Sequence, residues 1–192
     1  MPLILTAGPS TEPISLAEAK AHCRVDSDVE DTLVASLILA ARMHIERSLD
    51  VALIEQGWSL YLDAWPDRPS VKLPLAPVIS LDAVRLYSPT DSNITLDPSL
   101  FFLDGAGSRP RLVRRDAQAW PMPGRNANGI EIAFTAGYGP TADDVPMPIR
   151  LAIKMLVAHW FEAREPVLPG QEANALPLGV ASLITPYREV RL

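Results

Sequence analysis

His159 and Glu162 come nearest, among the residues of this sequence, to a metal-binding or acid–base pair. They stand three positions apart on a predicted helix, and this spacing lets two side chains share a metal in helical bundles. A di-metal bundle needs several such positions on facing helices, and the sequence has only this pair. We therefore interpret His159 as a packing or interface residue and predict no metal, no cofactor and no catalytic residue. The alternative, a small hydrolase that uses both residues, requires a bound metal.

The remaining candidates for chemistry have simpler structural interpretations. Asp143 and Asp144 form a carboxylate pair, but acidic residues just before a predicted helix are favourable near its positive N-terminal end. Residues 105–110 contain Gly-Ala-Gly without the third glycine or the following helix of a dinucleotide-binding motif, so we predict a turn there. The sequence contains neither a phosphate-binding loop nor a Gly-x-Ser-x-Gly nucleophile elbow. Catalysis therefore has little support.

A short basic cluster could contact the phosphates of DNA. It consists of Arg109, Arg111, Arg114 and Arg115. Asp116 follows directly, and the whole chain has 17 basic and 23 acidic residues, a net charge of −6. A solvated or intersubunit face is therefore the favoured interpretation. A DNA-binding packaging accessory protein is the alternative, and it predicts salt-sensitive duplex binding that requires these arginines.

Three features indicate where the protein is made. The single cysteine, Cys23, excludes an internal disulfide. Residues 1–8 lack the positive charge of a signal peptide, and their apolar run is too short for one. No stretch approaches the roughly 18 consecutive apolar residues that a membrane span requires. We expect the protein to be made in the cytosol and to remain there, or in a particle assembled there.

Two helices are predicted in residues 15–50. The Ser-x-x-Glu spacing of a capping box occurs at residues 15–18 and again at 27–30. The first begins a short helix that ends near Arg24, and the second begins a longer helix that ends near Leu49. Apolar residues recur along the longer helix at four-residue steps, at Val29, Leu33, Leu37, Ala41 and Ile45. With their apolar neighbours they form a stripe wider than one face, so one side could pack on a neighbouring subunit.

Residues 52–136 have the period-two alternation and the turn residues of a small antiparallel β-region. The strand candidates are 58–62, 79–86, 100–103, 111–114 and 130–135. The proline-rich stretch at 73–77 is typical of an edge or crossover, because proline cannot donate to a central ladder.

A further helix is predicted at residues 146–165, with Pro148 in its first turn, and residues 167–192 form a tail. The predicted fold class is therefore α+β, in a single domain of residues 1–192. Its helical bundle combines two N-terminal helices with one C-terminal helix, and the antiparallel β-region is inserted between them.

Four stretches carry a resemblance that keeps its order along nearly the whole chain. They are residues 15–26 with the helix ending in Ala40-Ala41-Arg42; 58–60 with 65–66 and 73–78; 134–139 with 145–146 and 156–162; and 176–180 with 183–188. Together they resemble the head–tail connector (adaptor) family of long-tailed phages and gene transfer agents. Cys23 departs from the family, which more often has an aliphatic residue there. The residues between Asp63 and Ala127 match least.

The resemblance implies a structural virion protein, not an enzyme. It implies a ring of twelve copies under the portal protein, in the neck of a particle assembled in the host cytoplasm. A stopper or tail-completion protein would bind the opposite side. DNA would pass through the central channel without specific binding, and no membrane would be involved.

The over-wide helical stripe and the apolar tail indicate which residues make the contacts. We expect intersubunit contacts at Val29, Leu33, Leu37 and Ala41. We expect portal docking by Leu178, Val180, Leu183, Ile184, Tyr187 and Arg188. The alternative for residues 178–184 is that they fold onto the chain's own helices.

Overall fold

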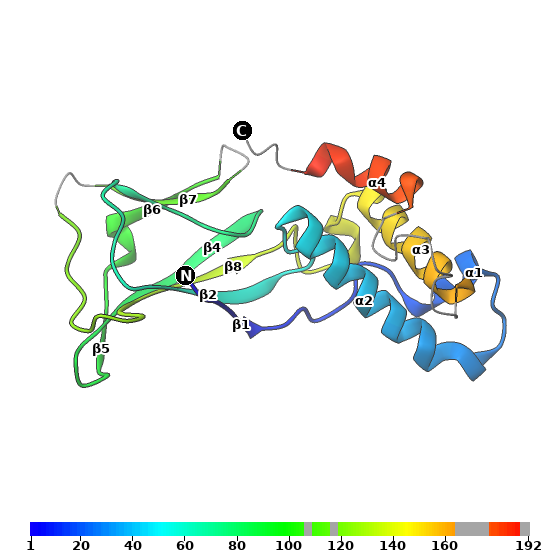
Figure 1. Ribbon diagram of the computed structural model, residues 1–192, viewed down its shortest axis with the longest axis horizontal. Helices are drawn as coiled ribbons and strands as arrows, with labels where there is room; N and C mark the ends of the chain where they lie inside the picture. Colours follow the sequence, from blue (N-terminus) through cyan, green and yellow to red (C-terminus); the bar gives the residue numbers. More distant parts are fainter. Residues whose placement is uncertain (106–108, 116–118, 164–176, 189–192) are drawn as a thin grey trace, which may run out of the picture. The chain divides into compact units, whose positions relative to one another are not determined.

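The structure is a computed structural model of the 192-residue chain. It describes residues 1–105, 109–115, 119–163 and 177–188 (Figure 1). These residues form two compact units that the chain enters alternately.

One unit, here the β unit, comprises Met1–Ser10 and Glu55–Gly139. The other, here the helical unit, comprises Thr11–Ile54 and the described part of Pro140–Leu192. The first ten residues thus belong with the strands, although the helices follow them directly in the sequence.

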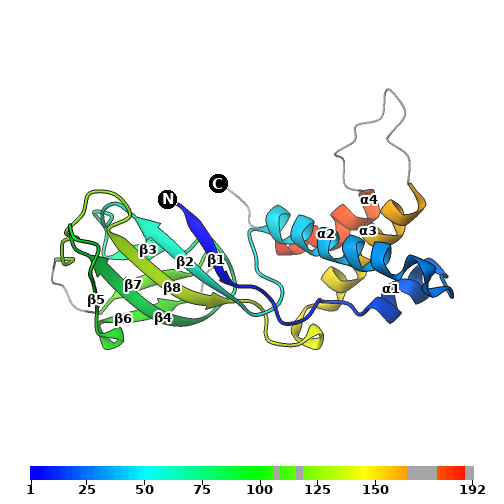
Figure 2. The same cartoon turned by 90° about the horizontal axis from the view of Figure 1, so that it is seen from below.

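The β unit contains a five-stranded and a three-stranded antiparallel sheet (Figure 2). In spatial order, the larger sheet consists of β1 (Leu3–Ala7), β2 (Gln56–Leu62), β8 (Ile130–Ala136), β4 (Val78–Tyr87) and β5 (Asn93–Thr95). The smaller sheet consists of β3 (Ser70–Lys72), β7 (Arg111–Arg114) and β6 (Phe101–Asp104), with the 3₁₀ turn η2 (Pro98–Leu100) before β6.

The core of the β unit follows from side-chain alternation along its central strand, β8. Ile130, Ile132 and Phe134 of β8 are fully buried, and the register sets Leu60 of β2 and Val84 of β4 beside Ile132. Strand residues two apart point to the same face, so one face of the sheet is apolar. The smaller sheet contributes further buried side chains, Val71, Leu112 and Phe101. The predicted alternation of β8 is confirmed.

Three short strands were not among the sequence predictions. β3 and β5 have only three residues each, which is too short for a periodic pattern to be recognised. β1 pairs with β2 through Leu3 and Leu60, so the β-region also draws on the start of the chain. The stretch at 73–77 connects β3 to β4, as a crossover would.

The helical unit contains α1 (Leu16–Cys23), α2 (Asp31–Leu49), α3 (Met147–Glu162) and α4 (Leu178–Ile184). Its 3₁₀ turns are η1 (Asp28–Glu30), η3 (Ala142–Asp144) and η4 (Thr185–Tyr187). Helix α3 packs against each of the other three helices. The core is made by Val34, Ile38, Ala41 and Ile45 of α2 together with Ile149, Ala152, Ile153 and Leu156 of α3.

The first predicted capping box is confirmed. The Glu18 amide donates to Ser15 Oγ at 3.1 Å, and the Ser15 amide donates to Glu18 Oε2 at 2.8 Å. The second capping box is wrong. Ser27 Oγ accepts from the Val29 amide at 3.3 Å and opens the single turn η1, so α2 begins at Asp31.

Three helices were predicted, but the helical unit contains four, because the described part of the tail forms α4. Val180 and Ile184 of this helix are buried, and α4 packs against α3. The buried side of α4 therefore agrees with the alternative for residues 178–184, that they fold onto the chain's own helices.

Candidate intersubunit and docking surfaces

An apolar face of α2 points away from the helical core. Met43 is 57% exposed, Leu39 one turn before it is exposed, and Leu33 is exposed near the start of the helix. In a helix of 3.6 residues per turn, Leu33 and Met43 lie on the side away from Ile38 and Ile45, which are buried, and Leu39 lies at the margin of that side. Exposed apolar patches of this kind mark interaction sites.

The four predicted intersubunit residues differ in how exposed they are. Val29 and Leu33 are exposed and Leu37 is half-buried, but Ala41 is fully buried in the subunit's own core. Ala41 lies on the same side of α2 as Ile45, so it cannot reach a neighbour and we remove it from the predicted contact. The exposed Leu39 and Met43 were missed. Helical periodicity places them away from the buried stripe, so a helical projection of the sequence could have found them.

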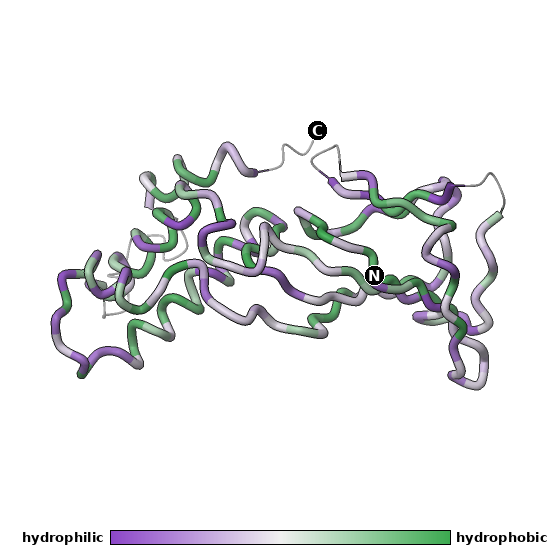
Figure 3. The backbone as a smooth tube through the Cα atoms, turned by 180° about the vertical axis from the view of Figure 1, so that it is seen from behind, coloured by the Kyte–Doolittle hydropathy of each residue, from purple (hydrophilic) through white to green (hydrophobic). Residues whose placement is uncertain are grey.

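Residues 26–30, here the acidic turn, place an apolar side chain among acidic ones. Val29 is 88% exposed, and Asp26 and Asp28 beside it are exposed too. Lys20 Nζ forms ion pairs that stabilise the turn, at 2.7 Å from Asp28 Oδ1 and 2.6 Å from Asp31 Oδ1. Figure 3 shows the connection between α1 and α2 as mainly hydrophilic, with short hydrophobic interruptions. Val29 is therefore exposed to solvent on a turn that is stabilised by ion pairs.

Helix α4 exposes only part of the predicted portal-docking set. Leu178 is 90% exposed and Arg188 is exposed, whereas Leu183 and Tyr187 are half-buried. Val180 and Ile184 are buried and cannot contact a partner while α4 stays in place. The docking role of the four accessible side chains remains a prediction.

The basic cluster is engaged in local contacts. Arg111 Nε donates to Asp104 Oδ2 at 3.2 Å, and Arg115 Nε donates to the Phe101 carbonyl at 2.9 Å. Arg114 donates to the Ala119 carbonyl. These contacts hold the guanidinium groups against β6 and the segment that follows β7.

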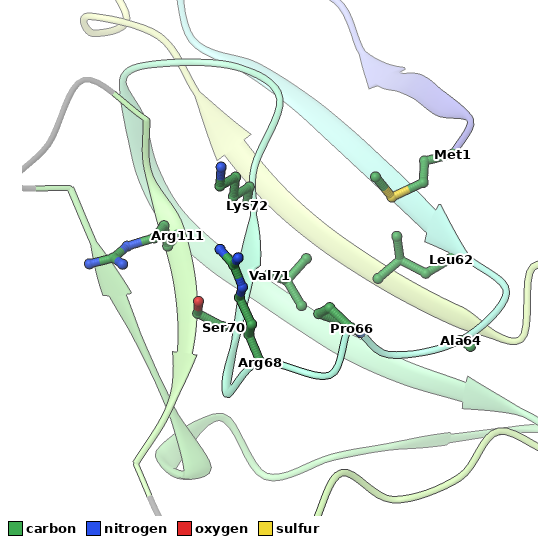
Figure 4. Close-up of a pocket in the computed structure, with 9 residues that line it drawn as sticks. All are labelled: Met1, Leu62, Ala64, Pro66, Arg68, Ser70, Val71, Lys72 and Arg111. Atoms are coloured by element: carbon green, nitrogen blue, oxygen red, sulfur yellow. The ribbon is translucent and has the colours of Figure 1, made fainter. Parts of the chain in front are cut away.

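A pocket of about 360 Å³ opens in the β unit beside β2 and β3 (Figure 4). Its apolar lining includes Leu62 and Val71, and three cationic residues, Arg68, Lys72 and Arg111, also line it. The full lining is Met1, Leu62, Ala64, Pro66, Arg68, Ser70, Val71, Lys72 and Arg111. Sequence reasoning missed this site because its residues come from several separate segments.

A buried carboxylate, Glu131, lies on the face of β8 opposite the apolar core. It accepts from Ser59 Oγ at 2.8 Å, from Arg85 Nη1 at 3.0 Å and from Tyr87 Oη at 2.6 Å. Burial raises the pKa of Glu131, but the hydrogen bonds from Tyr87 and Ser59 and the charge of Arg85 outweigh it and hold the pKa below its usual value. The bond to Glu131 raises the pKa of Tyr87 to about 12. All the polar groups of this cluster face one another, as in a structural network.

The residues considered for chemistry lie at the surface of the helical unit. His159 and Glu162 are both exposed near the end of α3. Asp143 forms an ion pair with Arg150 at 2.8 Å, and Asp144 accepts from the amide and the hydroxyl of Thr141, the N-cap of η3. Within the described ranges, no group of three or more His, Cys, Asp or Glu residues could hold a metal. No described helix is both long and apolar enough to span a membrane.

The described surface offers exposed apolar and charged side chains for contact with other molecules. Comparison with known proteins agrees with a protein that works through such contacts. The model of the family described as "Phage gp6-like head-tail connector protein" matches residues 13–93. Among curated proteins, none matches the chain.

Solved structures match the chain over its full length. A chain of the "Neck of empty GTA particle computed with C6 symmetry" is 30% identical, with a TM-score of 0.87. Chains of the "Virion of native gene transfer agent (GTA) particle" and of the "Neck of native GTA particle computed with C12 symmetry" are 29% identical, each with a TM-score of 0.82. Each of these three matches covers 100% of this chain and 97% of the other. The chain therefore belongs to the phage head–tail connector family.

Proposed function

We propose that this protein is a head–tail adaptor subunit that assembles as a ring of twelve copies in the neck of a phage-like particle. The full-length likeness to a neck chain, at 30% identity and a TM-score of 0.87, carries this proposal. A related neck was computed with C12 symmetry, which fits a ring of twelve. The surfaces of the chain agree, because a ring subunit must expose contact faces on both sides.

The seam between neighbouring subunits includes the exposed face of α2. Leu33, Leu39 and Met43 together offer apolar area that an isolated subunit leaves in water. Burying such area against a neighbour favours association, by about 25 cal/mol per Å² before the costs of binding are subtracted. The half-buried Leu37 lies at the margin of this face.

Helix α4 and the turn after it contact the portal protein, and a stopper or tail-completion protein binds the opposite side of the ring. Val180 and Ile184 anchor α4 to α3, which leaves Leu178 and Arg188 free to reach a partner. DNA passes through the channel without specific binding. An excess of acidic side chains, 23 against 17 basic ones, disfavours adhesion of DNA.

The portal contact is tested by particle assembly with Leu178→Asp and Arg188→Glu combined. Removing the whole segment would also uncover the face of α3 that Val180 and Ile184 cover, so surface substitutions separate docking from folding. We expect normally folded protein, and filled heads that fail to acquire tails. Normal attachment of tails by this variant would contradict the role of α4 in docking.

A further inference from the structure

The pocket of the β unit has cationic groups without a partner in the described part of the chain. Arg68 and Lys72 are exposed at its edge, and neither forms an ion pair with a described carboxylate. Arg111, the strand partner of Lys72 on β7, already pairs with Asp104. Figure 4 shows Arg68, Lys72 and Arg111 on one side of Val71, with Leu62 on the other side. A group that fits this pocket is therefore apolar at its tip and acidic around it.

The acidic turn of the helical unit has this chemistry. Val29 is 88% exposed, and the Asp28 side chain next to it is 90% exposed. Asp26, three residues before Val29 in the sequence, is exposed as well. Because Lys20 holds the turn in shape, little conformational freedom is lost when Val29 enters a pocket.

We propose that Val29 of one subunit inserts into the pocket formed by Arg68, Lys72 and Arg111 of a second copy of this chain. Asp26 and Asp28 then face the cationic edge. The contact rests on the proposed function, and it names two surfaces that meet at the ring seam. Burial of Val29 excludes water from the pocket, which strengthens the attraction between the charges around it.

Charge and the repetition of both surfaces on every copy favour a second copy as the occupant. Every copy carries one acidic turn and one basic pocket, so each subunit offers one half of the contact to each neighbour. The two surfaces differ, which makes the contact heterologous, and contacts of this type continue from subunit to subunit until a ring closes. Charges at the edge make the association sensitive to salt.

Charge variants of the full-length protein test the pairing of the two surfaces. Arg68→Glu with Lys72→Glu blocks the pocket, and Asp26→Arg with Val29→Ser blocks the turn. We expect each variant alone to need at least tenfold higher concentration to associate, as measured by analytical ultracentrifugation. An equimolar mixture retains one intact contact and stops at a pair of chains. The matched control, Arg68→Lys with Lys72→Arg, keeps the charges and should associate like the wild type.

Disulfide trapping identifies the occupant. On a Cys23→Ser background, Val29→Cys and Ser70→Cys are placed on the two surfaces, and the protein is oxidised in assembled particles. We expect a ladder of covalently linked chains, and at most linked pairs from either single cysteine. A fast-migrating monomer would show that the turn occupies the pocket of its own chain. The absence of a ladder would show that the turn of one copy does not reach the pocket of another. Either result would overturn the proposal.

Failure of the contact is distinguishable from failure of the proposed function. If the pocket and turn variants form rings as readily as the wild type, the contact is wrong and the ring proposal stands. If the wild type is absent from the necks of particles, the proposed function itself fails.

Discussion

Arg42 and Arg68 carry the same guanidinium group in opposite surroundings. Arg42 is 6% exposed in the helical unit, where it donates to Glu12 Oε2 at 2.8 Å and to Glu46 Oε2 at 2.7 Å. Arg68 lies exposed at the pocket of the β unit and pairs with no described carboxylate. The difference separates two uses of charge. Buried, paired charges hold a subunit together, and exposed charges remain available to another chain.

The largest effect on stability is expected at Arg42. Arg42→Ala leaves Glu12 and Glu46 without their cation, and breaking a buried pair in this way costs about 3–5 kcal/mol. Glu46 also accepts from the Leu53 amide at 2.9 Å, so the end of the link to β2 should loosen as well. Urea unfolding measures the loss. Arg68→Ala is the matched control, and its free energy of unfolding should stay within about 0.5 kcal/mol of the wild type. Equal losses in the two variants would contradict the comparison.

The next effect is expected at the buried carboxylate of β8. Glu131→Gln keeps the shape but weakens three hydrogen bonds to a charged group, for a loss of about 2 kcal/mol at neutral pH. The pKa of Glu131 is lower in the folded chain than its usual value of 4.5. The stability from its charge is therefore fully present above pH 4.5 and is lost as the pH falls through the folded-state pKa.

Unfolding of Glu131→Gln and of the wild type, compared from neutral to acidic pH, checks this sign. The difference between the two proteins should shrink as the pH falls. A difference that grows on acidification would show that the folded chain binds the proton more tightly than the unfolded chain.

A smaller effect is expected at the cap of α1. Ser15→Ala removes the acceptor of the Glu18 amide and costs about 1 kcal/mol. Ser15→Asp keeps an acceptor at the cap and should restore most of the loss. Thermal unfolding of the two variants measures both values. Equal melting temperatures for Ser15→Ala and the wild type would mean that the cap contributes nothing to stability.

The smallest effect on stability, with a large effect on association, is expected at α2. Met43→Glu changes an exposed side chain, so the free energy of unfolding should move by no more than about 0.5 kcal/mol. A charge on the proposed seam should still oppose ring formation. Size-exclusion chromatography with light scattering would show a shift toward monomers. Unchanged assembly would remove this face from the seam.

Local patterns predicted some parts of the structure well. The capping box of α1 needs only two residues of one turn, and the alternation of β8 needs only its own side chains. The end of α1 was predicted near Arg24, which forms its C-terminal cap in a left-handed conformation with φ at 56°. Such features are encoded in short segments, so no knowledge of the tertiary structure is required.

Features that depend on distant residues were not predictable in this way. α2 begins at Asp31, after the separate turn η1, and Lys20 of α1 pairs with Asp28 and Asp31 at this boundary. The apolar spacing of α2 predicted a second contact side, but the burial of Ala41 depends on where α3 packs. The pocket joins Leu62, Val71 and Arg111, whose proximity depends on the packing of two sheets.

Electron cryo-microscopy of particle necks that contain this chain tests the central claim most directly. We predict one closed ring of twelve copies between the portal and the stopper, with Val29 of each copy seated beside Arg68 and Lys72 of its neighbour. A neck without this chain, or with isolated copies that make no contact with one another, would contradict the account.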